Sequence, residues 1–211
     1  MSAILTDFLL TFLKGITDNG KIITILISMF PLIELKGAIP IGTLLGENLV
    51  TSALLGYIGS TLICIPIFFL LVPIFNLLKK IKFIKKFIEK IEAVLMNKAE
   101  KIAQKSNGKA EEVKTKFLSA ALLIFVAVPF PVTGVWTGTA IAVFVGLSFK
   151  NSFIPLVVGN LIAGSIITLL TFLFKDYVDI IVTALFIIAL VMLIIFIIKI
   201  IKSKPENPTQ N

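Results

Sequence analysis

Histidine and arginine are absent from this 211-residue sequence, and its one cysteine, Cys64, lies inside an apolar run. These absences exclude a zinc site, a disulfide framework and a histidine-based catalytic triad. No nucleophile and base pair is visible either, so we expect neither an enzyme nor a cofactor. Charged residues make up only 15% of the chain and hydrophobic residues 57%. Because a soluble domain cannot bury that much apolar surface, the composition predicts an all-α polytopic membrane protein.

Long uncharged runs mark the expected membrane segments. They cover residues 22–33, 37–46, 48–78, 117–149, 151–174 and 180–198. The third, fifth and sixth runs have the length of a spanning helix, which needs about 20 residues. They predict helices at 49–78 and 150–174 and a third one near the C-terminus, within residues 175–211.

The remaining runs do not have the pattern of single spanning helices. The run 117–149 would reach roughly 50 Å as one helix, and Pro129, Pro131, Gly134 and Gly138 interrupt its middle. The first two runs are too short to span and have two prolines between their centres. We therefore expect two re-entrant hairpins, at 21–46 and at 117–147.

An internal repeat supports this division. When the sequence is shifted by 100 residues without a gap, glycine, proline and serine positions coincide. The pairs are Phe30-Pro31 with Phe130-Pro131, Gly46 with Gly146, Ser52 with Ser152, and Gly59 with Gly159. Each repeat would consist of a hairpin followed by a spanning helix, at 21–78 and at 117–174.

The distribution of charge predicts how the chain lies in the membrane. If each hairpin returns to its side of origin, the two repeats are inverted, and 16 of the 20 lysines lie on one side. That side is expected to be the cytoplasm of a prokaryotic cell, and it would hold the linker 79–116 and the C-terminal tail. Residues 1–20 are too short to span and predict an interfacial helix on the other face.

The linker 79–116 carries 12 lysines and five acids, and its isoleucines recur at helical spacing. Two interpretations stay open. One is a solvated helical hairpin that fixes the topology, and the other is a surface that docks on anionic lipid headgroups. No nucleic-acid partner is expected, because a basic excess on a membrane protein usually marks its cytoplasmic face.

Glu34 and Lys36 are the charges within the first hairpin. A charge at membrane depth is costly unless it is paired, hydrated or facing a cavity, so both residues are candidates for a substrate or proton site. Across an unwound segment with Gly37 and Pro40, both side chains could point into one cavity. The alternative is a hairpin tip that reaches the far interface, where both charges are simply hydrated.

The second break supplies polar groups without charge. Pro131, Thr133, Gly134, Trp136 and Thr137 offer hydroxyls, an indole donor and a flexible backbone. Half-helix N-termini directed at a midplane cavity would attract a phosphate or a carboxylate. Threonines in membrane helices also bond their own backbone, and a tryptophan also packs or anchors at an interface.

The segments 34–42 and 129–138 together resemble the bacterial and archaeal small multidrug export proteins, and more distantly the DedA or VTT membrane proteins. The resemblance covers roughly residues 20–175. It implies two inverted re-entrant hairpins and, for the DedA relatives, proton-linked movement of phospholipids or polyprenyl-phosphate carriers. A second hairpin acid of the DedA pattern matches Glu47. The arginines of that pattern have no counterpart here, and only Lys36 could replace their charge.

We therefore interpret the chain as a plasma-membrane transporter in which Glu34 exchanges a proton while Lys36 and hairpin N-termini hold an anionic, lipid-like substrate. Efflux of lipophilic cations, with Glu34 as counter-ion, is the alternative within transport. A non-transporting membrane scaffold is the alternative of another class. Membrane lipids are expected partners. A homo-oligomer is permitted by small residues on the spanning helices, namely Gly56, Ser60, Gly159 and Gly164.

Overall fold

The computed structural model describes residues 17–31, 33–78, 109–130 and 132–177, together with the single positions 11, 15, 80, 180, 184, 187, 188, 191, 194 and 195. Most of the predicted N-terminal helix, most of the basic linker and most of the C-terminal helix lie outside these residues.

The all-α class is confirmed for the described residues, which form six α-helices and no strand. The elements are α2 (Gly20–Ser28), α3 (Glu34–Leu44), α4 (Leu49–Leu78), α6 (Ala110–Ala127), α7 (Val135–Phe144), α8 (Phe149–Leu173) and a short 3-10 turn, η1 (Lys175–Tyr177). Within the described part of the chain, α4 and α8 are the two helices long and apolar enough to cross a membrane.

Side-chain caps fix where three of these helices begin. Asn19 accepts a hydrogen bond from the Lys21 backbone at the start of α2, at 3.0 Å. Asn48 does the same for the Thr51 backbone at the start of α4, at 2.8 Å. Ser148 caps α8. These bonds satisfy backbone N–H groups that have no partner inside the helix.

Helix α6 begins at Ala110, inside the expected linker, and therefore includes residues 110–116. Glu111 and Glu112 lie in its first turn, where a negative charge is favourable. Lys116 lies 2.9 Å from Glu112 one turn later, and this contact lowers the pKa of the Glu112 carboxyl. Local charge pairing continues the helix beyond the apolar run, so its first residue does not coincide with the first uncharged residue.

Two turns 100 residues apart are built in the same way. Gly46 follows α3 with φ +90° and Gly146 follows α7 with φ +75°. The N–H of Gly46 donates to Thr43, and the N–H of Gly146 donates to Val143, at 3.1 and 3.2 Å. A left-handed residue suits glycine. Each turn leads from a short helix into a long one.

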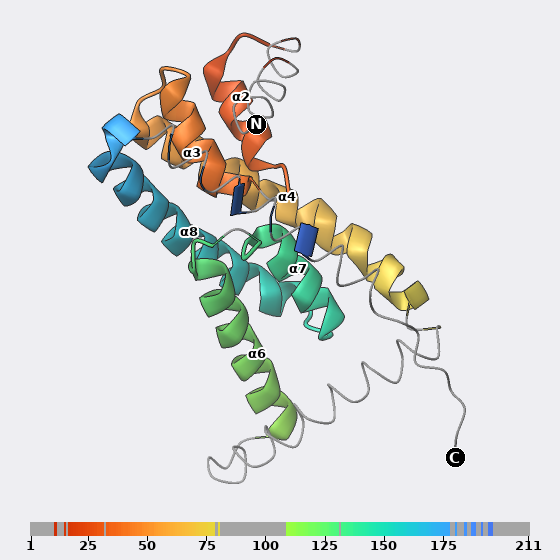
Figure 1. Cartoon of the computed structure of the whole chain (residues 1–211). Coiled ribbons are helices and arrows are strands. Elements are labelled where there is room, and N and C mark those ends of the chain that lie inside the picture. The colour runs from red at the N-terminus through yellow and green to blue at the C-terminus, as the bar shows by residue number, and fades with distance from the viewer. Residues whose placement is uncertain are drawn as a thin grey trace.

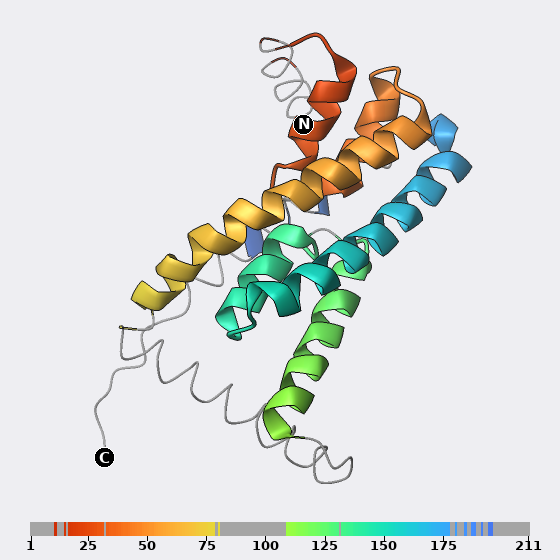
Figure 2. The ribbon, with the colours of Figure 1, turned by 180° about the vertical axis from the view of Figure 1, so that it is seen from behind.

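The short helices pair at opposite ends of the molecule (Figures 1 and 2). Helices α2 and α3 pack together at one end and α6 and α7 at the other, while α4 and α8 run antiparallel past both pairs. Helix α3 contacts both α4 and α8, and so does α7. The breaks within the two pairs consequently lie near the middle of the molecule.

Apolar side chains fill the spaces between the pairs and the long helices. Ile23 and Ile27 of α2 pack on α3, and Val126 of α6 belongs to a second cluster with α4, α7 and α8. The long helices also expose large apolar side chains, such as Leu62 of α4 and Leu169 of α8. Apolar side chains on an outer helix face are suited to contact with lipid.

Candidate functional site

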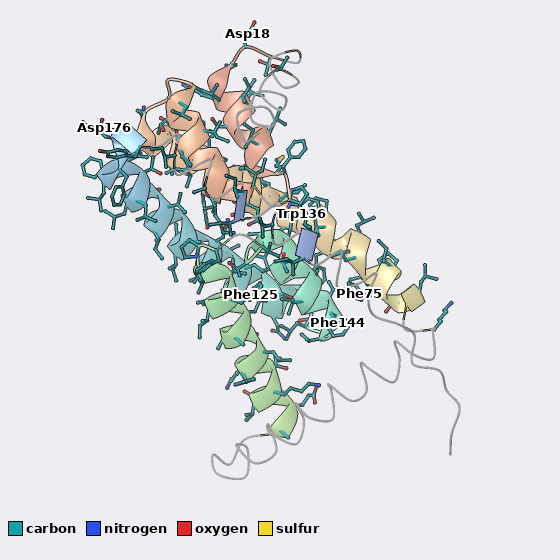
Figure 3. All side chains as sticks on the ribbon, viewed as in Figure 1. Asp18, Phe75, Phe125, Trp136, Phe144 and Asp176 are labelled. Atoms are coloured by element: carbon teal, nitrogen blue, oxygen red, sulfur yellow. The ribbon has the colours of Figure 1, made fainter. Side chains whose placement is uncertain are left out.

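The two helix breaks meet each other. One break separates α2 from α3 and contains Met29, and the other separates α6 from α7 and leads to Trp136. Figure 3 shows Trp136 midway along the molecule, between Asp18 at one end and Phe144 toward the other. The residues that bridge the breaks are about a hundred positions apart in the sequence.

Glu34 is the centre of these contacts. Its Oε2 lies 2.7 Å from the Nζ of Lys36, and both side chains are only 5% exposed. Its Oε1 accepts a hydrogen bond from the backbone N–H of Trp136 at 3.0 Å. The carboxylate therefore binds one donor from its own hairpin and one from the other hairpin. A buried carboxylate needs such partners, because desolvation of an unpaired charge is costly.

The carboxylate also caps helix α7 from a distant part of the chain. Gly134 is the N-cap residue of α7 and offers no side-chain cap. A Cβ added at Gly134 would overlap the Glu34 carboxylate, so glycine at this position makes room for it. The N-terminus of a helix carries partial positive charge and unpaired N–H groups. Glu34 thus occupies an anion-binding position.

Trp136 makes a second bond between the breaks. Its indole Nε1 donates to the carbonyl oxygen of Met29 at 3.0 Å. Met29 is the C-cap residue of α2, where carbonyl groups lack a partner inside the helix. Trp136 therefore bonds to both sides of the first break: its indole binds the end of α2, and its backbone N–H binds Glu34 at the start of α3.

Both breaks contain a non-glycine residue in the left-handed region. Glu34 has φ +48° and Val132 has φ +75°. Such residues store strain of about 1–3 kcal/mol each, and they concentrate at ligand sites and switch regions. The backbone that presents Glu34 is therefore held in place by its surroundings.

Two predicted residues, Gly37 and Pro40, are close to the ion pair in sequence. Their contacts affect the shape of α3 and do not involve the Glu34 carboxylate. Pro40 is buried inside α3 and has no N–H, so it cannot bond the carbonyl of Lys36 one turn earlier. A Cβ at Gly37 would press against the Ile33 side chain. These residues shape the helix that carries Glu34 and Lys36.

Other predicted residues are not brought to the carboxylate. Glu47 lies beyond the far end of α3, where its Oε1 is 3.2 Å from the position of a Cβ at Gly20. The Thr133 hydroxyl lies 2.7 Å from the carbonyl of Val128 and 2.8 Å from that of Phe130, and so closes the second break.

Two predicted residues remain, Thr137 and Pro131. The side chain of Thr137, in α7, is partly buried. Pro131 lies outside the described residues.

The sequence alone did not reveal the role of Met29 or the partners of Asn160. The Asn160 amide donates to the hydroxyls of Ser60 and Thr61, at 2.8 and 3.0 Å, and so joins α8 to α4. The shift of 100 residues that aligns Gly59 with Gly159 also aligns Ser60 with Asn160. The internal repeat could therefore have indicated that Ser60 and Asn160 occupy equivalent positions.

A sequence comparison identifies the family of the chain. Residues 34–166 match the protein family described as "Putative small multi-drug export protein". The match begins at Glu34 and includes Lys36, the second break and Trp136. No curated protein and no solved structure matches the chain. Since the matched residues make up more than half of the sequence, the chain belongs to this family of small multidrug export membrane proteins.

Proposed function

We propose that this protein is a proton-coupled membrane transporter for small amphipathic anions, among them lipid-linked phosphates. One observation carries the proposal. Glu34 is a buried carboxylate that occupies an anion-binding position, between the Lys36 ammonium and the N-terminus of α7. These are the groups that would bind a phosphate or carboxylate headgroup.

The proposed exchange follows from this arrangement. When Glu34 takes up a proton it loses its charge, so the Lys36 ammonium and the Trp136 N–H become available to another anion. An anionic headgroup then replaces the carboxylate. When Glu34 releases the proton, its carboxylate competes for the same donors and expels the substrate. Proton and substrate are thereby coupled through one shared set of donors.

We further propose that the repeats are inverted and that each pair of short helices is a re-entrant hairpin. Three features support this: α4 and α8 are antiparallel, the hairpin breaks meet midway, and the turns after α3 and α7 match. Movement of one repeat against the other would open the meeting point alternately to either side.

The charges at the two ends support a cytoplasmic position for the end where α6 begins. The described residues at that end include five lysines and two acids: Lys80, Lys109, Glu111, Glu112, Lys114, Lys116 and Lys150. Those at the opposite end include two lysines and three acids: Asp18, Lys21, Glu47, Lys175 and Asp176. Lysine-rich segments favour the cytoplasmic side.

Transport by the purified protein in liposomes tests the proposal, with an imposed pH gradient and a panel of lipid-linked phosphates and lipophilic cations. We expect Glu34→Gln to lose most substrate flux and its response to the pH gradient. Asp176→Asn is the matched control, because this exposed acid lies in η1, after the end of α8, and should keep its flux. Full transport by Glu34→Gln with unchanged pH dependence would show that Glu34 is not the coupling group.

Efflux of lipophilic cations is the second candidate, and the family description favours it. In that case a substrate cation would displace Lys36 from Glu34, with the partly buried Trp136 ring as an aromatic wall. Lys36→Met separates the two candidates. It should raise the KM for an anion at least about tenfold, which is 1.4 kcal/mol of binding, but should improve the binding of a cation.

A scaffold without transport activity would be the conclusion if Glu34 and Lys36 were both dispensable while the basic linker was not. Its readout is growth or membrane integrity in cells that carry the substituted chain. Loss of function on substitution of Glu34 alone, with the linker intact, contradicts the scaffold interpretation. The relation to DedA proteins is likewise a proposal, and transport of a lipid-linked phosphate would support it.

A further inference from the structure

Ser52, in the second turn of α4, has an unexplained buried hydroxyl. Its Oγ has no hydrogen-bond partner among the described residues, and its side chain is 0% exposed. Ser152, 100 residues later and equally buried, donates to the carbonyl of Ser148 at 2.5 Å. The equivalent bond from Ser52 to Asn48 is not formed. A buried hydroxyl without a partner costs free energy, so its presence calls for a reason.

A second hydroxyl lies beside Ser52. A Cβ built on Gly42 would be 2.6 Å from the Ser52 Oγ and 2.9 Å from the Thr24 Oγ1. The two oxygens are therefore no farther apart than the sum of these distances, a gap that one water molecule could bridge. Thr24 is fully buried and already donates to the carbonyl of Gly20 at 2.8 Å. Its oxygen remains able to accept a hydrogen bond.

A third hydroxyl continues toward the break between α2 and α3. Ser28 lies four residues after Thr24, about 6 Å along α2, and a Cβ on Gly59 of α4 would overlap its Oγ. Ser28 is fully buried and donates to the carbonyl of Ile25 at 2.7 Å, and its oxygen remains able to accept a hydrogen bond. Ser28 is the last residue of α2, and the next residue, Met29, binds the Trp136 indole.

These three hydroxyls lie where α2 packs on α3 and α4, and we call them the hydroxyl row: Thr24, Ser52 and Ser28. At its outer end the Glu47 carboxylate lies beside Gly20, one turn before Thr24. At its inner end the row reaches the break that holds Glu34. The row therefore extends from a charged end of the molecule to the proposed proton site.

In the other half of the molecule the corresponding helix, α6, buries apolar side chains in place of hydroxyls. The positions where α6 approaches Gly138 and Gly159 are occupied by Leu122 and Val126. Both side chains are buried and apolar. Packing alone would be served equally well by small or apolar residues in both halves. The difference between the halves points to a function of the hydroxyls that only one side of the protein needs.

We propose that the hydroxyl row, together with bridging water molecules, conducts the coupling proton between the Glu47 end of the protein and Glu34. The inference rests on the proposed function, because it assumes that Glu34 exchanges a proton. Each hydroxyl accepts a proton on its oxygen and releases its own to the next oxygen, so no bond changes overall. The proton leaves water at the Glu47 end and forms an O–H bond on the Glu34 carboxylate.

Two groups face the Glu34 carboxylate and are released when it is protonated. Lys36 faces it from α3, and the Trp136 backbone N–H faces it from α7. Neither is part of the hydroxyl row. Substitutions in the row should thus change how fast Glu34 is protonated without changing the groups that bind its carboxylate.

The test is the rate of Glu34 protonation in the full chain, reconstituted in liposomes and exposed to a sudden fall in pH. Infrared absorption of the protonated carboxyl group follows the reaction, and its absence in Glu34→Gln assigns the signal. We expect Ser52→Ala and Thr24→Val each to slow protonation at least about tenfold. Ser152→Ala, the matched position in the second half, should keep the rate of the unsubstituted chain.

Thermal unfolding separates this role from a structural one. Among the described residues the Ser52 hydroxyl has no hydrogen-bond partner in the protein, so Ser52→Ala should unfold at the same temperature or a higher one. Unchanged protonation rates in Ser52→Ala and Thr24→Val would overturn the hydroxyl row while leaving the proposed function intact. If the unsubstituted chain gave no Glu34 signal at any pH, the proton exchange of the proposed function would itself be wrong.

Discussion

Glu34 connects two parts of the chain that are distant in sequence, through the Lys36 ammonium and the Trp136 backbone. A buried ion pair often contributes little net stability, because desolvation of both charges offsets their attraction. In the proposed function, this ion pair instead allows Glu34 to alternate between a charged and a protonated state. With the carboxylate charged, the donors are occupied, and with the carboxylate protonated, they are free.

Gly134→Ala should disrupt this arrangement. Gly134 has φ −131°, an extended conformation that alanine also adopts, so the backbone alone tolerates the change. The added Cβ would overlap the Glu34 carboxylate and push it away from its partners. We expect a loss of stability of about 3 kcal/mol, similar to the breaking of a buried ion pair. Thermal or denaturant unfolding in detergent would measure it.

A double-mutant cycle tests the cause. In a Glu34→Ala background the carboxylate is gone, so adding Gly134→Ala should cost almost nothing further. Gly146→Ala is a control with open space but φ +75°, and it should lose roughly 1 kcal/mol through backbone strain alone. Equal losses from Gly134→Ala in both backgrounds would mean that the carboxylate is not what requires glycine.

The sequence predicted which residues form much of this site but not how they contact one another. Glu34 and Lys36 stand out because charges are rare in apolar segments, and Gly134 and Trp136 because they lie at a break. The resemblance to the DedA pattern adds Glu47 to them, but the length of α3 separates Glu47 from Glu34. Which donors Glu34 contacts could not be predicted, since its bond to Trp136 joins residues 102 positions apart.

At the scale of helices, Asn160 joins α8 to α4. Its amide donates to the hydroxyls of Ser60 and Thr61. Hydrogen bonds between membrane helices contribute about 0.6 kcal/mol on average and up to about 1.7 kcal/mol. Because Asn160 makes two such bonds, we expect Asn160→Ala to lose about 1–2 kcal/mol of stability. Thermal unfolding in detergent is the measurement.

Ser60→Ala provides the comparison for this prediction. It removes one acceptor but leaves the Thr61 hydroxyl for the Asn160 amide, so it should cost less than Asn160→Ala. Substitution of the exposed Ser165, which bonds only within its own helix, should have a negligible effect. A loss from Ser60→Ala as large as that from Asn160→Ala would show that Ser60 stabilises the interface in some other way.

Helix type was easier to predict than helix ends. The apolar runs predicted two long helices, which the structure contains as α4 and α8. The start of α6 was not predicted, because pairs such as Glu112 with Lys116 extend a helix into charged sequence. Side-chain caps and charge pairs act over one turn, whereas hydropathy reports on a whole segment.

At the scale of the whole molecule, the side of the membrane on which each turn lies decides whether the two hairpins can share one site. These turns follow α3 and α7. The turns after α3 and α7 lie at opposite ends, and the long helices between them are antiparallel (Figures 1 and 2). If both hairpins return to their side of origin, one turn faces the outside and the other faces the cytoplasm. If instead the hairpins crossed fully, the charges of Lys150 would lie outside, against the distribution of lysine.

Cysteine accessibility in intact cells distinguishes these arrangements. After replacement of Cys64, single cysteines at Asn48, Asn107, Asn151 and Ser203 are exposed to a thiol reagent that cannot cross the membrane. We expect only the cysteine at Asn48, in the turn before α4, to react from outside, and the other three to react only after the membrane is opened. Reaction of the Asn151 and Ser203 cysteines from outside would mean full crossings and parallel repeats. A shared site reached alternately from the two sides would then have no structural basis.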